Sequence, residues 1–352
     1  VDRQSNRIVV GAKRLATVKD DEDRHNYAYV FYGDTFFDTS KDPKWLGMGH
    51  EMIAFTHYYI VENGESFYLH AGESINIKDM EVPHIRHDFH ETSDDKSDWD
   101  NLMHAISDGI SRGEMTKVVA SREVQFTSDT PFNVASILAN LVENNPNCFI
   151  FGYEKDGRTF VGASPEILVR HRGSEILSYA LAGTAPKDGP HAWAKEQLLT
   201  DEKNLFEHNI VRDRIVHTMN EVTQDVSVGK TEIMELAHLY HLRTIITAKD
   251  STKSLIEWAK LLHPTPALGG EPRDKALALL QQYEAHERGM YAAPFGFMKD
   301  MGDGIIVVAI RSALIIDNVL YAYAGCGVVA DSDADEEYIE TNNKMRTILD
   351  AL

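Results

Sequence analysis

The sequence predicts a protein of the mixed α/β class, and three observations support this prediction. Residues 1–95 carry short apolar segments that are separated by turn-forming Gly, Asp and Asn. Apolar residues recur at helical spacing in residues 99–112 and 192–222. From Gly304 to Ile316 an apolar run has the composition of a buried strand. A chain of 352 residues with such elements forms one large domain or two ordinary ones.

Composition narrows the class of partner. The chain has 35 basic and 55 acidic residues, so its formal charge is −20. Phosphate backbones and anionic membranes would repel it, and we expect neither nucleic acid nor membrane partners. An anionic ligand would therefore need local Lys and Arg residues. The sequence has only two cysteines, Cys148 and Cys326, no apolar stretch of membrane-spanning length and no signal-peptide pattern, which favours the cytoplasm.

The N-terminal part reads as strands and loops. Strand candidates lie at residues 7–11, 27–31, 52–59 and 66–69. Residues 84–91 include three histidines and Glu91, but they lack a recognisable ligand spacing, so we interpret them as a solvated loop and not as a metal site. The acidic run 94–98 is interpreted as a linker into the next helix, at 99–112.

Two ionisable residues lie at strand ends in the next part of the chain. Lys117 opens the strand 117–122. It either solvates the strand end or is a partly desolvated amine that takes a proton from water. After a helix at 132–142 and strands at 148–153 and 159–163, Glu166 follows Pro165 at a turn. Glu166 is either a turn residue or, if the turn faces a dry pocket that raises its pKa, a general acid.

The middle of the chain offers further polar groups. Leu181 to Thr184 ends a strand with a small-residue turn that can present backbone N–H groups. In the predicted helix 192–222, Glu207 borders the apolar stripe, as either a surface or an inward glutamate. His241 lies in an extended segment, where a hydrogen-bonded core role is more common than catalysis. A helix is predicted at 273–286.

The apolar run 304–316 carries one charge. In a strand, alternation places Arg311 on the same face as Ile305 and Val307, so its guanidinium must reach solvent or face an anion. The next strand ends in Gly325-Cys326-Gly327, where a ligand can approach the backbone closely. These residues predict an anion pocket at the ends of buried strands.

A terminal helix is predicted from a cap at Ser332 or Asp333 to Leu352. Glu337, Glu340 and Lys344 share one face of it, with Glu340 and Lys344 spaced for a salt bridge. The sequence contains no phosphate-binding GxxxxGK[ST] loop, no GxGxxG opening a helix and no GxSxG elbow.

Nine ordered motifs resemble one enzyme family. They are KVVASREV, FVGASPEILV, LAGTAPK, EKNLFEHNIV, LHPTPALGGEP, ERGMYAAPFGF, VAIRSALI, YAGCGVVADSD and ETNNKMRTIL, between Leu102 and Leu352. The set resembles the chorismate-utilising enzymes and, within them, the isochorismate synthases. The resemblance implies one domain over residues 1–352, with antiparallel sheets packed face to face and helices outside. Residues 1–95 would be its variable β-rich part and 99–352 its catalytic part.

The resemblance also implies a reaction and its residues. Water adds to C2 of chorismate and hydroxide leaves C4, with Lys117 as the general base and Glu166 as the general acid. Mg²⁺ would be held by Glu207 and Glu340, with Glu337 in its outer shell, which suits a hard ion. The implied substrate-binding residues are Gly183, Thr184, His241, Ala267, Leu268, Tyr291, Arg311, Gly325, Gly327 and Lys344. The product would feed menaquinone or siderophore biosynthesis.

Comparison within the resembled family favours water as the nucleophile. Anthranilate-forming relatives lack a lysine at the position of Lys117, and aminodeoxychorismate-forming relatives carry a lysine where Ala182 stands. The alternatives are a salicylate synthase, which goes on to eliminate pyruvate, and a non-catalytic chorismate-binding protein. We expect a monomer.

Three departures accompany the resemblance. Asn204 stands where the family usually has aspartate, which predicts weaker outer-shell support for Mg²⁺. The segment between Thr184 and Glu207 is shorter than expected, and the chain begins with Val1. We interpret both of these as residues omitted from the sequence.

Overall fold

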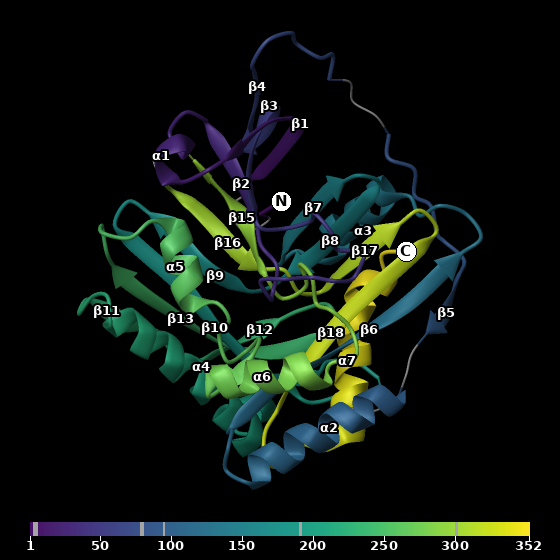
Figure 1. The fold of residues 1–352 in the computed structure, drawn as a ribbon, viewed down its shortest axis with the longest axis vertical. Helices are drawn as coiled ribbons and strands as arrows, with labels where there is room; N and C mark the ends of the chain where they lie inside the picture. The colour runs from purple at the N-terminus through teal and green to yellow at the C-terminus, as the bar shows by residue number, and fades with distance from the viewer. Residues whose placement is uncertain (3–5, 78–80, 94–95, 190–191, 300–301) are drawn as a thin grey trace.

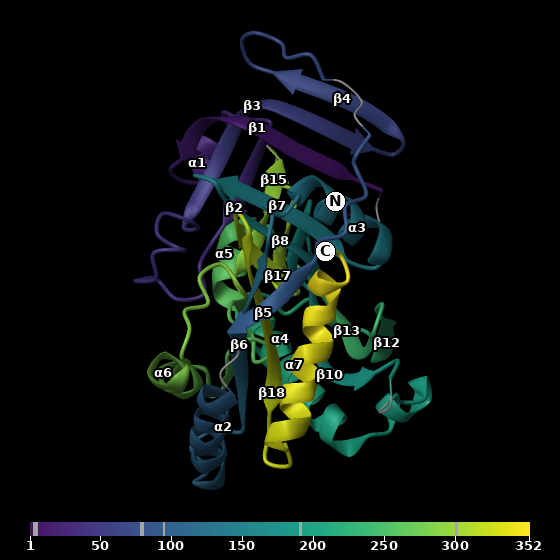
Figure 2. The ribbon, with the colours of Figure 1, turned by 90° about the vertical axis from the view of Figure 1, so that its right-hand side faces the viewer.

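The structure, a computed structural model, describes residues 1–2, 6–77, 81–93, 96–189, 192–299 and 302–352. Within these ranges the strands form an eleven-stranded and a seven-stranded antiparallel sheet, with helices packed around them (Figure 1). Figures 1 and 2 show the N-terminal strands at one end of the molecule and α2 (Lys96–Ser111) at the opposite end. The predicted class, with antiparallel sheets, is confirmed.

The larger sheet joins strands from both halves of the chain. Across the sheet the order is β1 (Ile8–Val18), β3 (Glu51–Glu62), β2 (Tyr29–Gly33), β15 (Pro294–Lys299), β16 (Gly304–Val308), β9 (Ile167–Arg172), β10 (Glu175–Pro186), β13 (Leu239–Lys249) and β11 (Val226–Val228), with β4 (Glu65–His70) beside β3 and β12 (Glu232–Glu235) beside β13. The four strands predicted in the N-terminal part are all present. Because β2 pairs with β15, this part of the chain is continuous with the sheet that the later strands form.

The smaller sheet carries the glycine-rich segment. Its order is β14 (Gly270–Glu271), β6 (Lys117–Ser128), β18 (Val319–Val328), β17 (Ser312–Ile316), β8 (Arg158–Ser164) and β7 (Phe149–Lys155), with β5 (Phe89–Ser93) beside β6. In the β6–β18 pair, Gly327 lies opposite Val119 and Gly325 opposite Ser121. The start of β6 and the end of β18 therefore lie side by side.

Helices cover both sheets. Besides α2 they are α1 (Asp21–Arg24), α3 (Val134–Asn144), α4 (Glu202–Asn220), α5 (Leu255–Leu262), α6 (Arg273–Tyr283) and α7 (Ala334–Leu349). Helices α4 and α5 contact the larger sheet, whereas α2, α3, α6 and α7 contact the smaller one. None of the helices in the described ranges is long and apolar enough to cross a membrane.

One apolar cluster connects the two sheets. It includes Phe160 and Leu314 of the smaller sheet with Leu168, Ile176 and Ile306 of the larger. All five are at most 1% exposed, so their burial contributes roughly 1.5–3 kcal/mol each by ordinary transfer values. Val211, Ile215 and Met219 of α4 join the same cluster.

The prediction of one strand over 304–316 is wrong, because the run is two strands in different sheets. β16 pairs with β9 and β15 of the larger sheet, and β17 pairs with β8 and β18 of the smaller one. The break falls at Arg311, whose φ of 52° lies in the left-handed region that ends a strand. Arg311 thus does not alternate with Ile305 and Val307 on one strand face.

Other boundaries also differ from the predictions. The helix predicted from 192 begins only at Glu202, because the Asp201 side chain accepts a hydrogen bond from Asn204 N and caps it; a short 3₁₀ turn, Lys195–Leu199, precedes it. Residues 96–98 belong to α2 and not to a linker, while Asp94 and Asp95 lie outside the described residues. The histidine segment is not simply a solvated loop. His87 is buried and its Nε2 accepts a hydrogen bond from Asn133 N at 3.0 Å.

Candidate active site

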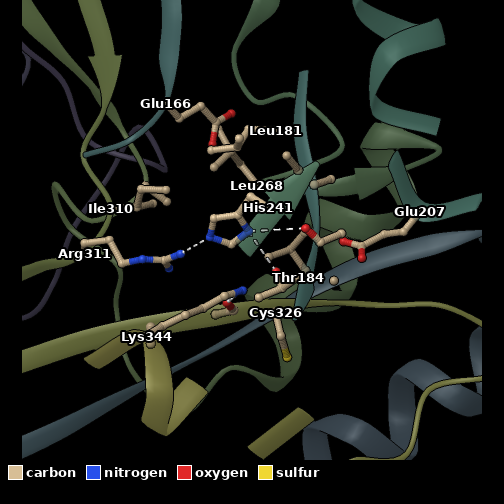
Figure 3. A pocket seen from close by; sticks show the side chains of 18 of the residues that line it. Glu166, Leu181, Thr184, Glu207, His241, Leu268, Ile310, Arg311, Cys326 and Lys344 are labelled. Carbon is tan, nitrogen blue, oxygen red and sulfur yellow. Dashed lines mark hydrogen bonds between the residues drawn. The ribbon is translucent and has the colours of Figure 1, made fainter. Parts of the chain in front are cut away.

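A pocket lies where β10, β13, β18, α4 and the turn between β16 and β17 meet, and most of the predicted site residues line it (Figure 3). These are Glu166, Gly183, Thr184, Glu207, His241, Ala267, Leu268, Tyr291, Arg311, Gly325, Gly327 and Lys344. Lys117, Glu337 and Glu340 do not line it, but each contacts a charged partner beside it. Residues separated by more than 170 positions in the sequence are therefore brought to one site.

Glu166 supplies a buried carboxyl group. It lies in the turn between β8 and β9, is 2% exposed, and its Oε1 has no hydrogen-bond partner among the described residues. Burial raises the pKa of Glu166 to about 8, against the opposing charges of Lys117, Arg311 and Lys344. The carboxyl group is therefore largely protonated at pH 7, as a general acid must be.

Arg311 brings a cation to the opposite side of the pocket. One of its terminal nitrogens lies 2.6 Å from His241 Nε2, and Figure 3 shows the two side chains directed toward each other. His241 Nδ1 lies 3.1 Å from Thr184 Oγ1. Burial, reinforced by the charges of Arg311 and Lys344, lowers the pKa of His241 well below its usual value, so the imidazole is neutral. Among the described residues no carboxylate pairs with Arg311, so its charge is available to an anion.

Lys344 adds a second cation. Its Nζ donates to Gly325 O at 2.7 Å and lies 2.6 Å from Glu340 Oε1, so the predicted salt bridge is confirmed. Tyr291 also lines the pocket, and its ring stacks on Tyr323 with 5.4 Å between the ring centroids. Burial raises the pKa of Tyr291, so its phenol stays protonated and can donate a hydrogen bond. The cations reverse the negative charge of the chain locally.

Lys117 and Glu207 form an ion pair beside Gly327. Lys117 is fully buried, and its Nζ lies 2.9 Å from Glu207 Oε1. The distance is that of an ion pair, but the angles are not those of a hydrogen bond, and Nζ has no other partner among the described residues. A Cβ at Gly327 would lie 2.1 Å from Glu207 Oε1 and 2.7 Å from Lys117 Cε. Only glycine leaves room for both charged groups here.

Lys203 pairs with a carboxylate beside the pocket, because its Nζ lies 2.9 Å from Glu337 Oε1. Burial opposes the charge of Lys203, but the charges of Glu337, Glu340 and Glu207 together raise the pKa of its ammonium. Burial and the neighbouring Glu340 raise the pKa of Glu337. The described residues contain no ready-made group of three His, Cys, Asp or Glu ligands, although the carboxylate oxygens of Glu207 and Glu340 are donors of the kind that suits Mg²⁺.

Asn204 makes its side-chain hydrogen bonds within the protein. Its Oδ1 accepts from Thr184 N at 2.8 Å, and its Nδ2 donates to Asp201 Oδ1 at 2.8 Å. Both polar atoms are therefore engaged at the turn that lines the pocket. The weaker outer-shell support for Mg²⁺ expected from Asn in place of aspartate stays a prediction.

Sequence reasoning missed several residues around the pocket. Arg288 is 1% exposed and donates to Leu268 O and Val119 O, which fixes the loop before β14. Lys203 was missed because a lysine on a helix usually signals a solvated face. Apolar lining residues, such as Leu181 and Ile310, carry no chemical signal in a sequence. The charge of Arg288 within an apolar motif was the one available clue.

Residues 72–352 match the family of chorismate binding enzymes. The chain belongs to this family. This chorismate-binding enzyme is 35% identical over 265 residues to the isochorismate synthase MenF of Bacillus subtilis, covering 73% of this chain and 56% of that protein. It is 34% identical over 257 residues to anthranilate synthase component 1 of Arthrobacter globiformis, covering 70% of this chain and 48% of the relative. The chain thus spans about half the length of these two relatives.

The fold agrees with a solved relative. It matches the menaquinone-specific isochorismate synthase MenF of Escherichia coli with a TM-score of 0.83 at 25% identity, over 99% of this chain and 87% of the other. The predicted family and fold are confirmed. Because relatives with different printed activities match at similar identity, the reaction of this chorismate-binding enzyme has to be argued from its site.

Proposed function

We propose that this chorismate-binding enzyme is an isochorismate synthase, an isomerase that adds water at C2 of chorismate and releases the C4 hydroxyl. One observation carries the proposal: a buried carboxyl with a pKa of about 8 lines the pocket, and a buried lysine lies 2.9 Å from Glu207, which lines the same pocket. Exchange of one hydroxyl for another needs a proton donor and a proton acceptor near pH 7. Relatives named isochorismate synthase support the proposal.

Each of the two groups has one role in the proposal. Glu166 donates its proton to the departing hydroxyl, for which its protonated state and unpartnered Oε1 are suited. Lys117 accepts a proton from the attacking water as a neutral amine, so the proposal requires Glu207 to leave its ion pair with Lys117 and the ammonium to lose its proton before the step. Removal of water from the surroundings of both groups strengthens their electrostatic effect on the substrate.

The substrate carries two carboxylates, and the proposal assigns cations to both. Arg311, Tyr291 and the backbone near Gly325 and Gly327 bind the enolpyruvyl carboxylate, because no carboxylate of the described residues pairs with Arg311. The rest of the substrate would be bordered by six further residues that line the pocket: Gly183, Thr184, His241, Ala267, Leu268 and Lys344.

Mg²⁺ belongs with the ring carboxylate in this proposal. Glu207 and Glu340 would hold the ion, and Glu337 would lie in its outer shell. When bound, Mg²⁺ supplies positive charge that holds the ring carboxylate and offsets the charge of the glutamates. The charges of all three glutamates act on the Lys203 ammonium and raise its pKa, which supports this choice of ligands for a cation.

Water is the proposed nucleophile. Ala182 lines the pocket where aminodeoxychorismate-forming relatives carry a lysine, and Lys117 is present where anthranilate-forming relatives lack one.

The product would enter menaquinone or siderophore biosynthesis. The two cysteines are free and buried, which supports a cytoplasmic location. Pairing of β2 with β15 supports a single domain. We propose that the active form is a monomer.

The test is incubation of the purified protein with chorismate and Mg²⁺, with an EDTA control, followed by chromatography and a pyruvate assay. The proposal predicts an EDTA-sensitive isomer of unchanged mass without pyruvate. Salicylate with matching pyruvate would instead identify a salicylate synthase. Chorismate binding without any product would identify a non-catalytic chorismate-binding protein.

A further inference from the structure

One face of α4 is joined to the strands below it by two buried side chains. Asn204 and His208 lie four residues apart and therefore on the same face of the helix. Asn204 is 8% exposed and His208 is fully buried. Between them in the sequence stands Glu207, which points into the pocket. The hydrogen bonds of Asn204 and His208 therefore determine the position of Glu207 on the helix between them.

Asn204 binds the strand after Gly183. Its Oδ1 accepts a hydrogen bond from Thr184 N at 2.8 Å, and its Nδ2 is held by Asp201 Oδ1 at 2.8 Å. The same Asp201 oxygen accepts from Asn204 N at 2.8 Å and caps the helix. Asp201 therefore fixes which way round the amide lies, with its oxygen toward Thr184.

His208 binds the same strand before Gly183. Its Nδ1 lies 3.1 Å from Ala182 O, a pure acceptor, so Nδ1 carries the hydrogen. Its Nε2 then accepts from Thr244 Oγ1 at 2.7 Å, on the neighbouring strand β13. The imidazole thus joins α4 to two adjacent strands of the larger sheet.

Gly183 lies between the two attachment points at an irregularity of β10. The strand register shifts between Ala182 and Thr184, and Gly183 has a φ of +79°. A Cβ there would lie 3.0 Å from Asn204 O, so the helix packs directly on this glycine. A bulged strand segment has no regular hydrogen-bond ladder to fix its position. The contacts of Asn204 with Thr184 N and of His208 with Ala182 O, called the clamp below, supply that fixation.

From this geometry we propose that Asn204 and His208 are positioning residues that hold the Glu207 carboxylate at a fixed distance from the Gly183–Thr184 turn. Glu207 and Thr184 line the same pocket from two different elements. The clamp makes the two elements one rigid unit before any ligand binds. This inference rests on the proposed function in one respect, because the proposed function assigns Glu207 to Mg²⁺. Outer-shell contacts of this kind typically change metal affinity by about 10- to 100-fold.

The discriminating variant is Asn204→Leu, which keeps the approximate size of the side chain but removes both the acceptor for Thr184 N and the donor to Asp201. Calorimetric titration of Mg²⁺ into the ligand-free chain should show binding weakened by about 10- to 100-fold. His208→Ala, which removes the contacts to Ala182 O and Thr244, should weaken Mg²⁺ binding in the same range.

Controls separate positioning from general destabilisation. His217→Ala changes an exposed histidine of the same helix, and it should leave Mg²⁺ affinity, kcat and KM unchanged. If Asn204→Leu lowers only the melting temperature, while the folded protein binds Mg²⁺ and chorismate as before, the proposal is refuted. If the unmodified protein binds no Mg²⁺, the proposed function fails and the inference fails with it. If the unmodified protein binds Mg²⁺ and both Asn204→Leu and His208→Ala bind it equally well, the inference alone is overturned.

Discussion

Replacement of Glu166 by glutamine should remove a pH-dependent cost of folding. Burial raises the pKa of Glu166 from 4.5 to about 8. Between those values the folded protein holds a proton that the unfolded chain has lost, so stability falls as pH rises. The contribution of Glu166 is fully present below pH 4.5 and is lost as pH approaches 8. At about 1.4 kcal/mol per pH unit, the loss between pH 6 and pH 9 is about 3 kcal/mol.

Glutamine has no such titration, so the difference between the two proteins isolates Glu166. We expect the free energy of unfolding of Glu166→Gln, relative to the unmodified protein, to rise by about 3 kcal/mol from pH 6 to pH 9. Denaturant unfolding at both pH values, without Mg²⁺ or chorismate, measures it. A difference that stays the same at both pH values would refute a raised pKa for Glu166. The same titration predicts that turnover of the unmodified enzyme decreases above about pH 8.

Three further predictions concern the pocket. Lys117→Ala should lower kcat by about 10²- to 10⁴-fold while chorismate binding is largely kept, because a general base contributes to that extent; undiminished turnover in the assay would remove Lys117 as the base. Gly327→Ala places a Cβ 2.1 Å from Glu207 Oε1, so Mg²⁺ affinity measured by calorimetry should fall. Gly152→Ala, whose Cβ meets neighbours only at 3.4 Å or more, is the matched control and should behave like the parent protein. Arg311→Lys loses the planar fork, and KM for chorismate should rise by about 10-fold or more since a hydrogen bond to a charged group contributes about 1.5–3 kcal/mol; an unchanged KM would contradict anion binding by Arg311.

Much of the fold was predictable where one local pattern decides it. The short apolar segments and turn residues of the N-terminal part predicted its four strands, and of the two predicted caps, Ser332 and Asp333, the structure uses Asp333 for α7. The split of 304–316 was not predictable, because Ala309 and Ile310 are as apolar as their neighbours and no glycine marks the left-handed Arg311. An apolar run shows that residues are buried, but it does not show in which sheet.

The candidate site was likewise predictable where single residues in motifs decide it, and not where packing between elements decides it. Residues that carry chemistry, such as Glu166 and Lys344, were predicted through motifs and do line the pocket. The partners that set their geometry were not, because a contact between Asn204 and Thr184 or between His208 and Ala182 depends on how a helix packs on a strand. A sequence gives the order of side chains, whereas packing decides which of their polar atoms meet.

The passage of the chain between sheets at Arg311 has a consequence for how the protein unfolds. β16 and β17 follow each other in the chain with three residues between them, yet each is hydrogen-bonded within a different sheet. Neither sheet can separate without pulling on the other, so we expect the two strands to lose hydrogen-exchange protection in a single event. Because the pocket is lined by residues of both sheets, a fragment that contained only one of the sheets would lack part of it. We therefore expect the two sheets to unfold as one cooperative unit, with Arg311 at the junction between them.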